Sequence, residues 1–299
     1  MSAELGSLSV TAPLLAVLGV LALWFAVQWW RRARAALGGG GQRPGLLDVV
    51  IGAVTNFFDT LGIGAFAPTT AVFKVLRRVP DEQIPGTLNV GHALPTVAQA
   101  LIFIAVVKVD PVTLIGMIAA AVAGAWITVA FVARAPRRTI QLAMGLALLV
   151  AAFLFLAAVL GWMPAGGEQL GLTGPKLAIA IAANFVLGGL MMLGIGLYAP
   201  CLTLVSLLGM SPVVAFPIMM GSCAFLMPVG GARFVASGRF NPGAALGLTL
   251  GGVPAVLVAA YIVKSLPLDW LRILVVIAAG YAALSMLWSA RRDSAAGAV

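Results

Sequence analysis

Two short glycine-containing motifs carry the residue types best suited to binding a ligand. Residues 61–68 read Leu-Gly-Ile-Gly-Ala-Phe-Ala-Pro, and residues 193–200 read Leu-Gly-Ile-Gly-Leu-Tyr-Ala-Pro, identical at six of eight positions and 132 residues apart. Glycine permits a tight turn and a close approach to the backbone, and proline suits the first turn of a helix. Each motif therefore predicts a break between two half-helices. The positive end of the second half-helix would face the break, where it favours an anion.

We expect the substrate-binding residues to lie at these breaks and on the half-helices that precede them. The alternative is that the glycines only let helices pack closely, but their duplication at one offset favours a site. Two asparagines on the first half-helices could donate amide hydrogens to an oxyanion, or could equally bond a neighbouring helix. The expected set is Asn56, Gly62, Ile63, Gly64, Ala65, Asn184, Gly194, Ile195, Gly196 and Leu197.

Two ionisable side chains are candidates for coupling transport to a proton. Asp59 is the only acidic residue deep inside an apolar run, and an intramembrane carboxyl is a functional hypothesis by default. It could carry a proton or accept backbone N–H bonds at the break; Met191 occupies the corresponding place in the second copy. His92 can titrate near neutral pH, although a packed, hydrogen-bonded histidine is the alternative. Pro95 is expected to kink this span and free carbonyl groups toward a cavity.

The composition places these motifs in a membrane. Of the 299 residues, 62% are hydrophobic and 9% are charged, with a mean hydropathy of +1.10. A soluble domain carries roughly a quarter charged residues, so soluble enzymes, disulfide scaffolds and nucleic-acid-binding domains are excluded. A single histidine leaves no basis for a metal or other cofactor site, and little for a membrane-embedded enzyme. Cys201 and Cys223 lie in apolar stretches and are expected to be buried thiols.

Apolar runs predict an all-α polytopic protein with about seven transmembrane helices and two broken helices. The runs 46–76 and 177–208 are too long for one span and too short for two, and the glycine motifs interrupt them. We expect each to be a re-entrant hairpin. The ordinary spans are predicted at about 11–30, 86–107, 111–133, 139–162, 212–231, 242–263 and 270–289.

The basic residues predict how the chain is oriented. If both broken runs return to their own side, 14 lysines and arginines face the cytoplasm and four face outward; if both runs cross, the division is 10 against 8. The positive-inside rule favours the hairpins. The N-terminus would then lie outside and the C-terminus in the cytoplasm, in the inner (cytoplasmic) membrane of the cell.

These elements form two inverted repeats behind an accessory helix. Residues 1–45 would hold that helix and a glycine-rich linker, 46–163 the first hairpin with three spans, and 175–292 the second. An odd number of spans in each repeat inverts the second copy. Inverted repeats with discontinuous helices are a recurring plan of secondary transporters, whose substrate sites lie where the breaks meet.

The duplicated motifs, together with the stretch Asn56-Phe57-Phe58-Asp59-Thr60 before the first, resemble the sulfite exporter TauE/SafE family. We expect the resemblance to cover about 46–288 and to leave the first helix outside. Many members carry a third glycine where this chain has Ala65 and Leu197. The resemblance implies transport of sulfite, an organosulfonate or a related sulfur-containing or carboxylate anion. A passive anion channel is the alternative; the expected partners are this anion and the lipid bilayer, with no nucleic acid.

Overall fold

The structure, a computed structural model, describes residues 2–38, 43–162, 166–262 and 269–296. Every regular element of these residues is a helix, which confirms the all-α prediction. A helix satisfies its backbone groups internally, as lipid requires. In chain order the elements are α1 (Ser2–Gly38), α2 (Leu46–Thr60), α3 (Phe66–Val75), η1 (Asp81–Gln83), α4 (Ile84–Gly91), α5 (Ala93–Val106), α6 (Pro111–Val132), α7 (Arg137–Val159), α8 (Gly174–Met192), α9 (Tyr198–Leu207), η2 (Pro212–Val214), α10 (Ala215–Ser237), α11 (Pro242–Ile262) and α12 (Asp269–Ala296).

Seven helical segments of the described residues are long and apolar enough to cross a bilayer. The count equals the number predicted, and six of the seven are predicted spans; the seventh is α8, which the sequence predicts as one arm of a broken helix, and the predicted span 270–289 is not among them. The predicted span 270–289 lies within α12. The seven segments are Thr11–Arg34, Asp81–Val106, Pro111–Val132, Arg137–Val159, Gly174–Met192, Pro212–Ser237 and Pro242–Tyr261.

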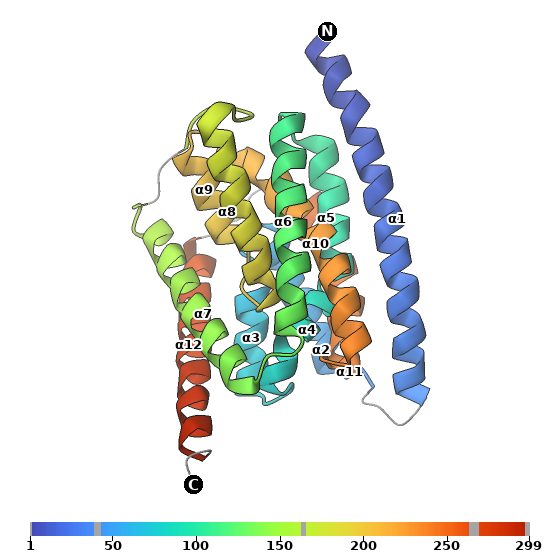
Figure 1. The fold of residues 1–299 in the computed structure, drawn as a ribbon, viewed down its shortest axis with the longest axis vertical. Helices are drawn as coiled ribbons and strands as arrows, with labels where there is room; N and C mark the ends of the chain where they lie inside the picture. The colour runs from blue at the N-terminus through green and yellow to red at the C-terminus, as the bar shows by residue number, and fades with distance from the viewer. Residues whose placement is uncertain (1, 39–42, 163–165, 263–268, 297–299) are drawn as a thin grey trace.

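The two long apolar runs are each divided where the glycine motifs predict a break. Residues 61–65 separate α2 from α3, and residues 193–197 separate α8 from α9. The outer ends of each pair lie together: Arg78, just after α3, donates to the Asp48 carboxylate of α2 at 2.6 Å. Likewise Lys176 of α8 donates to the Leu208 carbonyl after α9 at 2.9 Å. The first pair opens toward the lower end of the bundle in Figure 1 and the second toward the upper end.

The helices before the breaks exchange packing partners between the two halves of the chain. Helix α2 packs on α11, and α8 packs on α6. Glycine makes both contacts close: a methyl group on Gly52 would overlap the Leu248 backbone, and one on Gly124 would overlap the Phe185 carbonyl. Small residues allow helices in a membrane to approach this closely. Each broken helix is thus supported by the other half.

A kink lies between α4 and α5 at His92, three residues before Pro95. Proline cannot donate to the carbonyl four residues earlier, which here belongs to Gly91. The Thr249 hydroxyl of α11 donates to that carbonyl at 2.6 Å. The prediction that the freed carbonyl faces a cavity was therefore wrong, because a side chain of α11 satisfies it.

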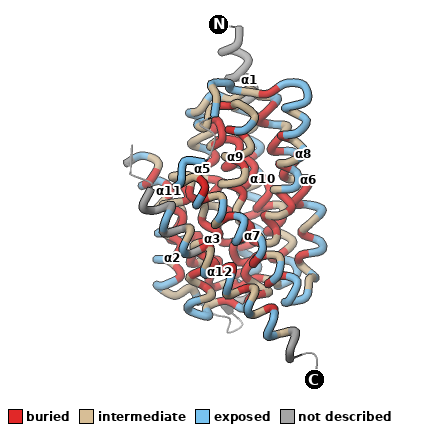
Figure 2. Tube along the Cα trace, turned by 90° about the vertical axis from the view of Figure 1, so that its left-hand side faces the viewer, coloured by how far each residue is buried: buried red, intermediate tan, exposed pale blue. Residues whose placement is uncertain are grey.

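Buried residues gather in the centre of the bundle and exposed ones on its outside (Figure 2). Many of the exposed side chains are large and apolar, such as Phe131, Phe153 and Val186. Helix α1 packs along α10 and buries Phe25 and Trp29. This distribution suits a protein whose perimeter faces lipid.

Five groups of basic residues lie at one end of the bundle. In Figure 1 the end of α1, the loop after α3, the α6–α7 connection, the α10–α11 connection and the end of α12 all lie at the lower end. The basic residues in or next to these segments are Arg31, Arg32, Arg34, Arg43, Lys74, Arg77, Arg78, Arg134, Arg137, Arg138, Arg233, Arg239, Arg291 and Arg292. The α5–α6 connection, which contains Lys108, and the start of α8, which contains Lys176, lie at the opposite end (Figure 1).

Candidate functional site

The two helix breaks meet face to face in the centre of the bundle. A Cβ atom added to Gly64 would have the Tyr198 Cβ as its nearest neighbour, at 3.9 Å. One added to Gly196 would likewise have the Phe66 Cβ nearest, at 3.8 Å. Each second glycine therefore faces the first residue of the helix that follows the other break. The N-termini of α3 and α9 converge at this point.

The two motifs differ in backbone conformation. Gly62, Gly64 and Gly194 have φ of +90°, +87° and +87°, a region that only glycine adopts without cost. Gly196 has no such angle. A Cβ at Gly196 would make only an ordinary van der Waals contact, so neither the turn nor the packing around this residue requires glycine.

Two small cavities flank the meeting point. One has a volume of about 10 Å³, room for roughly one water molecule, and the other about 20 Å³. The first brings together Asp59, Gly64, Ala65, Phe66, His92, Thr96, Met191, Gly196, Leu197, Tyr198 and Cys223. The second is lined by Ile63, Gly64, Phe66, Ala67, Ala147, Leu148, Ala151, Phe155, Ile195, Gly196, Tyr198 and Ala199. The meeting point of the breaks is therefore closed around very little free space, whereas a separate apolar pocket of about 360 Å³ between α7 and α8 reaches Leu193, Ile195 and Pro200 of the second break.

Asp59 is buried at the N-terminus of α3 within a hydrogen-bonded chain. Its carboxylate accepts from the Gln99 side-chain amide at 2.8 Å and from the Ala65 backbone N–H, which belongs to the N-cap of α3. The Tyr198 hydroxyl in turn donates to the Gln99 carbonyl oxygen at 2.7 Å. One carboxylate is thus linked to both breaks. At the N-terminus of α9 the corresponding residue is Met191, which carries no charge.

His92 is buried between α2 and α3 and bonded through both ring nitrogens. The Asn56 amide nitrogen donates to the Gly52 carbonyl, so its oxygen is the acceptor for His92 Nδ1 at 3.0 Å. The Thr69 hydroxyl lies 3.1 Å from Nε2 and can donate to it. A neutral imidazole with its proton on Nδ1 satisfies this arrangement. Asn56 therefore positions His92 and does not itself line either cavity.

The remaining predicted site residues lie farther from the meeting point. Asn184 donates to the Met117 carbonyl at 2.7 Å and to the Ser222 hydroxyl at 2.9 Å, so it joins α8 to α6 and α10. Gly62 lies against the ring of Phe216, and Gly194 lies against Met144. None of these three predicted residues lines a cavity at the breaks.

Gln99 and Tyr198 are the polar residues that sequence reasoning missed. Gln99 is fully buried, and it joins Asp59 to the second break. Two signals were present in the sequence: a lone amide in an otherwise apolar span, and a tyrosine where the first motif has Phe66. Among the described residues, no three His, Cys, Asp or Glu side chains gather as metal ligands do. Cys201 and Cys223 are buried and free, and Cys223 Sγ lies 3.3 Å from Met191 Sδ.

Comparison with known proteins places the chain in a family of membrane transporters. Residues 2–155, just over half of the chain, match the family described as Sulfite exporter TauE/SafE. The match takes in α1, which had been expected to lie outside the resemblance, and it ends in α7. No curated protein and no solved structure gives a match. With seven apolar helices of membrane-spanning length and this match over half of its length, the chain is a multi-pass membrane protein that belongs to the sulfite exporter TauE/SafE family.

Proposed function

We propose that this protein is a secondary transporter that moves a small oxyanion across the cytoplasmic membrane. The anion would be sulfite, an organosulfonate or a related sulfur-containing or carboxylate anion. The observation that carries the proposal is the convergence of two half-helix N-termini at paired glycines in the bundle centre. Such ends attract negative charge without a buried lysine or arginine. The family name supports sulfite as the first anion to test.

The scaffold in this proposal is a pair of inverted repeats, each with a re-entrant hairpin. Three observations support it: the motifs recur at one offset, the pairs α2–α3 and α8–α9 open toward opposite ends, and their packing partners are exchanged. Alternating access would then move one hairpin and its supporting helices against the other. We place the basic end in the cytoplasm by the positive-inside rule, with the N-terminus outside and the C-terminus inside.

Within the site, we place the anion at the N-terminus of α9. The N-terminus of α3 already has a negative group, since the Asp59 carboxylate accepts from the Ala65 N–H. The α9 end has only Met191 in that position, so its free N–H groups are the ones left for a ligand. Gly196 and Leu197 would approach the anion through their backbone. The Tyr198 hydroxyl would turn from Gln99 to donate to it.

The residues around this position shape or couple the site in our proposal. Gly62, Ile63, Gly194 and Ile195 form the turns, while Gly64 and Ala65 form the opposite wall. Asp59 is the first candidate for carrying a coupling proton, and His92 is the second. Of the ten proposed binding residues, Asn184 has the least support, because its amide is bonded to neighbouring helices.

A cavity with room for about one water favours a transporter over an open channel. The anion fits only if the halves separate, and such a closed state belongs to an alternating-access cycle. A channel built on the same scaffold would pass anions without this rearrangement. Counterflow distinguishes the two, because only a transporter exchanges labelled for unlabelled anion against its own gradient.

The proposal is tested by the melting temperature of the purified protein in the presence of candidate ligands. A ligand that binds the folded state raises the melting temperature by mass action, by an amount that grows with its concentration over Kd. We expect sulfite, thiosulfate, sulfoacetate or a short carboxylate to raise it, and choline or sodium at equal ionic strength to leave it unchanged. Tight binding of a cation, or no shift with any anion and no anion uptake by proteoliposomes, would refute the proposed function.

A further inference from the structure

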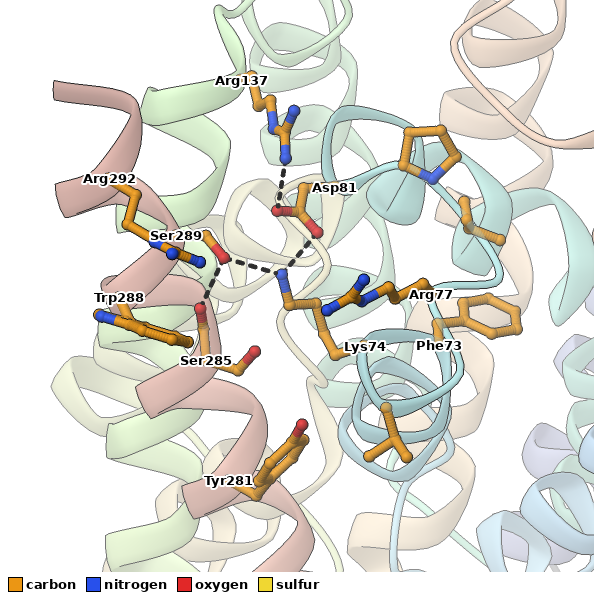
Figure 3. Close-up of a pocket in the computed structure, with 13 residues that line it drawn as sticks. Phe73, Lys74, Arg77, Asp81, Arg137, Tyr281, Ser285, Trp288, Ser289 and Arg292 are labelled. Carbon is orange, nitrogen blue, oxygen red and sulfur yellow. Dashed lines mark hydrogen bonds and ion pairs between the residues drawn. The ribbon is translucent and has the colours of Figure 1, made fainter. Parts of the chain in front are cut away.

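A pocket of about 450 Å³ opens at the basic end of the bundle, between α3, α7 and α12 (Figure 3). Its volume is in the range of small-ligand sites and far exceeds that of the two small cavities at the meeting point of the breaks. Its lining includes four cations, Lys74, Arg77, Arg137 and Arg292, and one acid, Asp81. We refer to it as the basic pocket.

Two of the four cations are already engaged by acidic side chains. Lys74 Nζ lies 2.8 Å from Asp81 Oδ1, and Arg137 lies 3.6 Å from the other oxygen of Asp81. Arg137 also approaches Glu82 at 3.7 Å and Asp293 at 3.3 Å, at the edge of the pocket. These ion pairs connect the walls of the pocket, and they pair Asp81, the one acidic residue of its lining, with cations.

The other two cations have no acidic partner within the described part of the chain. Arg77 is exposed to the pocket, and Arg292 stacks on the Trp288 ring with its guanidinium carbon 4.6 Å from the ring centroid. In Figure 3 both guanidinium groups point toward the Lys74 ammonium, from opposite walls. Lys74 is paired with Asp81, but the charges of Arg77 and Arg292 have no acidic partner among the described residues, and such charge attracts an anion.

Arg77 follows the C-cap of α3, where the Arg78 N–H donates to the Phe73 carbonyl at 3.0 Å and ends the helix in a left-handed turn. Its φ is +48°, and it is the only non-glycine residue of the described chain with a positive φ. This conformation is common after a helix C-terminus, and Gly209 adopts it after α9 with φ of +90°. Here it turns the guanidinium into the pocket, beside Lys74 (Figure 3).

A seam of small residues leads from the basic pocket to the helix breaks. Ala67 and Ala71 of α3 pack against Ala279, Ala282 and Ala283 of α12, with Leu148 of α7 beside them. Ala67 and Leu148 also line the cavity at the breaks, while Phe73 and Tyr281 line the basic pocket. Helix α3 thus joins the two over ten residues, about 15 Å. Alanine contacts let these helices pack closely, so no large side chain stands between the two.

We propose that the basic pocket is the vestibule in which the transported oxyanion binds before or after it passes the breaks, along the seam between α3 and α12. This inference rests on the proposed function and adds a second anion-binding position to it. A phosphate headgroup of an anionic lipid has the same chemistry, and the exposed rings of Trp288 and Tyr281 at the rim suit the membrane interface. The experiment must therefore separate the two sources of anion.

The test measures uptake of labelled sulfite by proteoliposomes made of phosphatidylcholine alone. The variants are Arg77→Asn, Arg292→Gln and their combination. Asparagine tolerates the positive φ of residue 77, so the first variant removes the charge and keeps the turn. The control is Arg138→Gln, which removes an exposed charge at the same end but outside the pocket.

The expectation concerns the protein molecules that are inserted with the basic pocket facing the added sulfite. In these molecules the double variant should raise the sulfite concentration for half-maximal uptake by about tenfold, and uptake should depend less on salt concentration. The control should transport as the wild type does. The same defect should appear when about a quarter of the lipid is anionic. A defect seen only with anionic lipid would mean that the pocket binds headgroups, and normal kinetics in the double variant would also overturn the vestibule. If the wild type itself neither binds nor transports sulfite or another anion, the proposed function fails and not merely this inference.

Discussion

Replacing Gly196 by alanine should separate anion binding from folding. The backbone at Gly196 is one that any residue can adopt, and an added Cβ would meet nothing closer than the Phe66 Cβ at 3.8 Å. That is an ordinary van der Waals contact. Removing a glycine at a compatible position stabilises a protein by about 0.4–1 kcal/mol through the unfolded state. The Gly196→Ala variant should therefore melt at or slightly above the wild-type temperature.

The same variant should bind sulfite at least about tenfold more weakly. The new methyl group would occupy a cavity with room for roughly one water, beside the N-terminus of α9 where we place the anion. A displacement of the anion that loses a single charge-assisted hydrogen bond costs about 1.5–3 kcal/mol, which corresponds to tenfold or more in Kd. The variant thus has opposite expected effects on stability and on binding.

The Gly64→Ala variant is the informative comparison with Gly196→Ala. The two glycines have similar free space for a methyl group, but their backbone conformations differ. A Cβ on Gly64 would lie 3.9 Å from the nearest atom, but φ is +87°. Alanine there costs about 1–2 kcal/mol, or roughly 2–8 °C in melting temperature. Sulfite affinity should fall less than in Gly196→Ala, because the α3 end is held by Asp59.

Gly238→Ala is the matched control for backbone strain. Its φ is +70°, nothing lies within 4 Å of an added Cβ, and it follows α10 at the basic end of the bundle. It should lower the melting temperature as Gly64→Ala does and leave sulfite binding unchanged. Isothermal titration with sulfite and thermal unfolding measure both quantities on each variant. Wild-type affinity in Gly196→Ala, or its failure to fold, would refute this account of the breaks.

Two further predictions concern coupling and topology. The Asp59→Asn variant should keep sulfite binding but lose uptake driven by a pH gradient. The sulfite affinity of the wild type should weaken as pH rises through about 5 to 8, because an ionised Asp59 carboxylate repels the anion. The sulfite affinity of the variant should not change over this pH range. Flat wild-type affinity, or full gradient-driven uptake by the variant, would remove Asp59 from this role. Single cysteines placed at 79–84 and 209–211, in a background with Cys201 and Cys223 replaced, should be labelled from the cytoplasm and from outside respectively. Labelling of 79–84 from outside would contradict the hairpins.

The positions of the helix breaks could be predicted from the sequence because their cause is local. Glycine and proline act on the backbone of their own turn, so two copies of one motif predict two breaks wherever the rest of the chain lies. The conformation of Gly196 was not predictable in this way. Its motif matches that of Gly64, yet its φ differs, because the residues packed around each break are different.

The hydrogen-bonded partners at the site depend on packing between distant segments. Gln99 bonds Asp59 across 40 residues and Tyr198 across 99, and no spacing in the sequence indicates such pairs. The two asparagines make the same point. Asn56 and Asn184 both lie on the helix before a break, but at the 132-residue offset Asn56 corresponds to Gly188 and Asn184 to Gly52. Asn56 faces His92, whereas Asn184 bonds α6 and α10. The two side chains stand at different places along their helices, and only the packing of the folded chain shows which neighbour each one meets.

The differences between the two copies matter more for the proposed function than their likeness. Two identical breaks would present two equal helix N-termini, and an anion would have no preferred side and no proton carrier. In this chain Asp59 supplies one end with its own carboxylate, and Met191 leaves the other end open. The exchange of Phe66 for Tyr198 adds a hydroxyl that is linked through Gln99 to that carboxylate. An anion that draws the hydroxyl away would alter the hydrogen bonding of Asp59, and this gives proton and anion a direct physical connection.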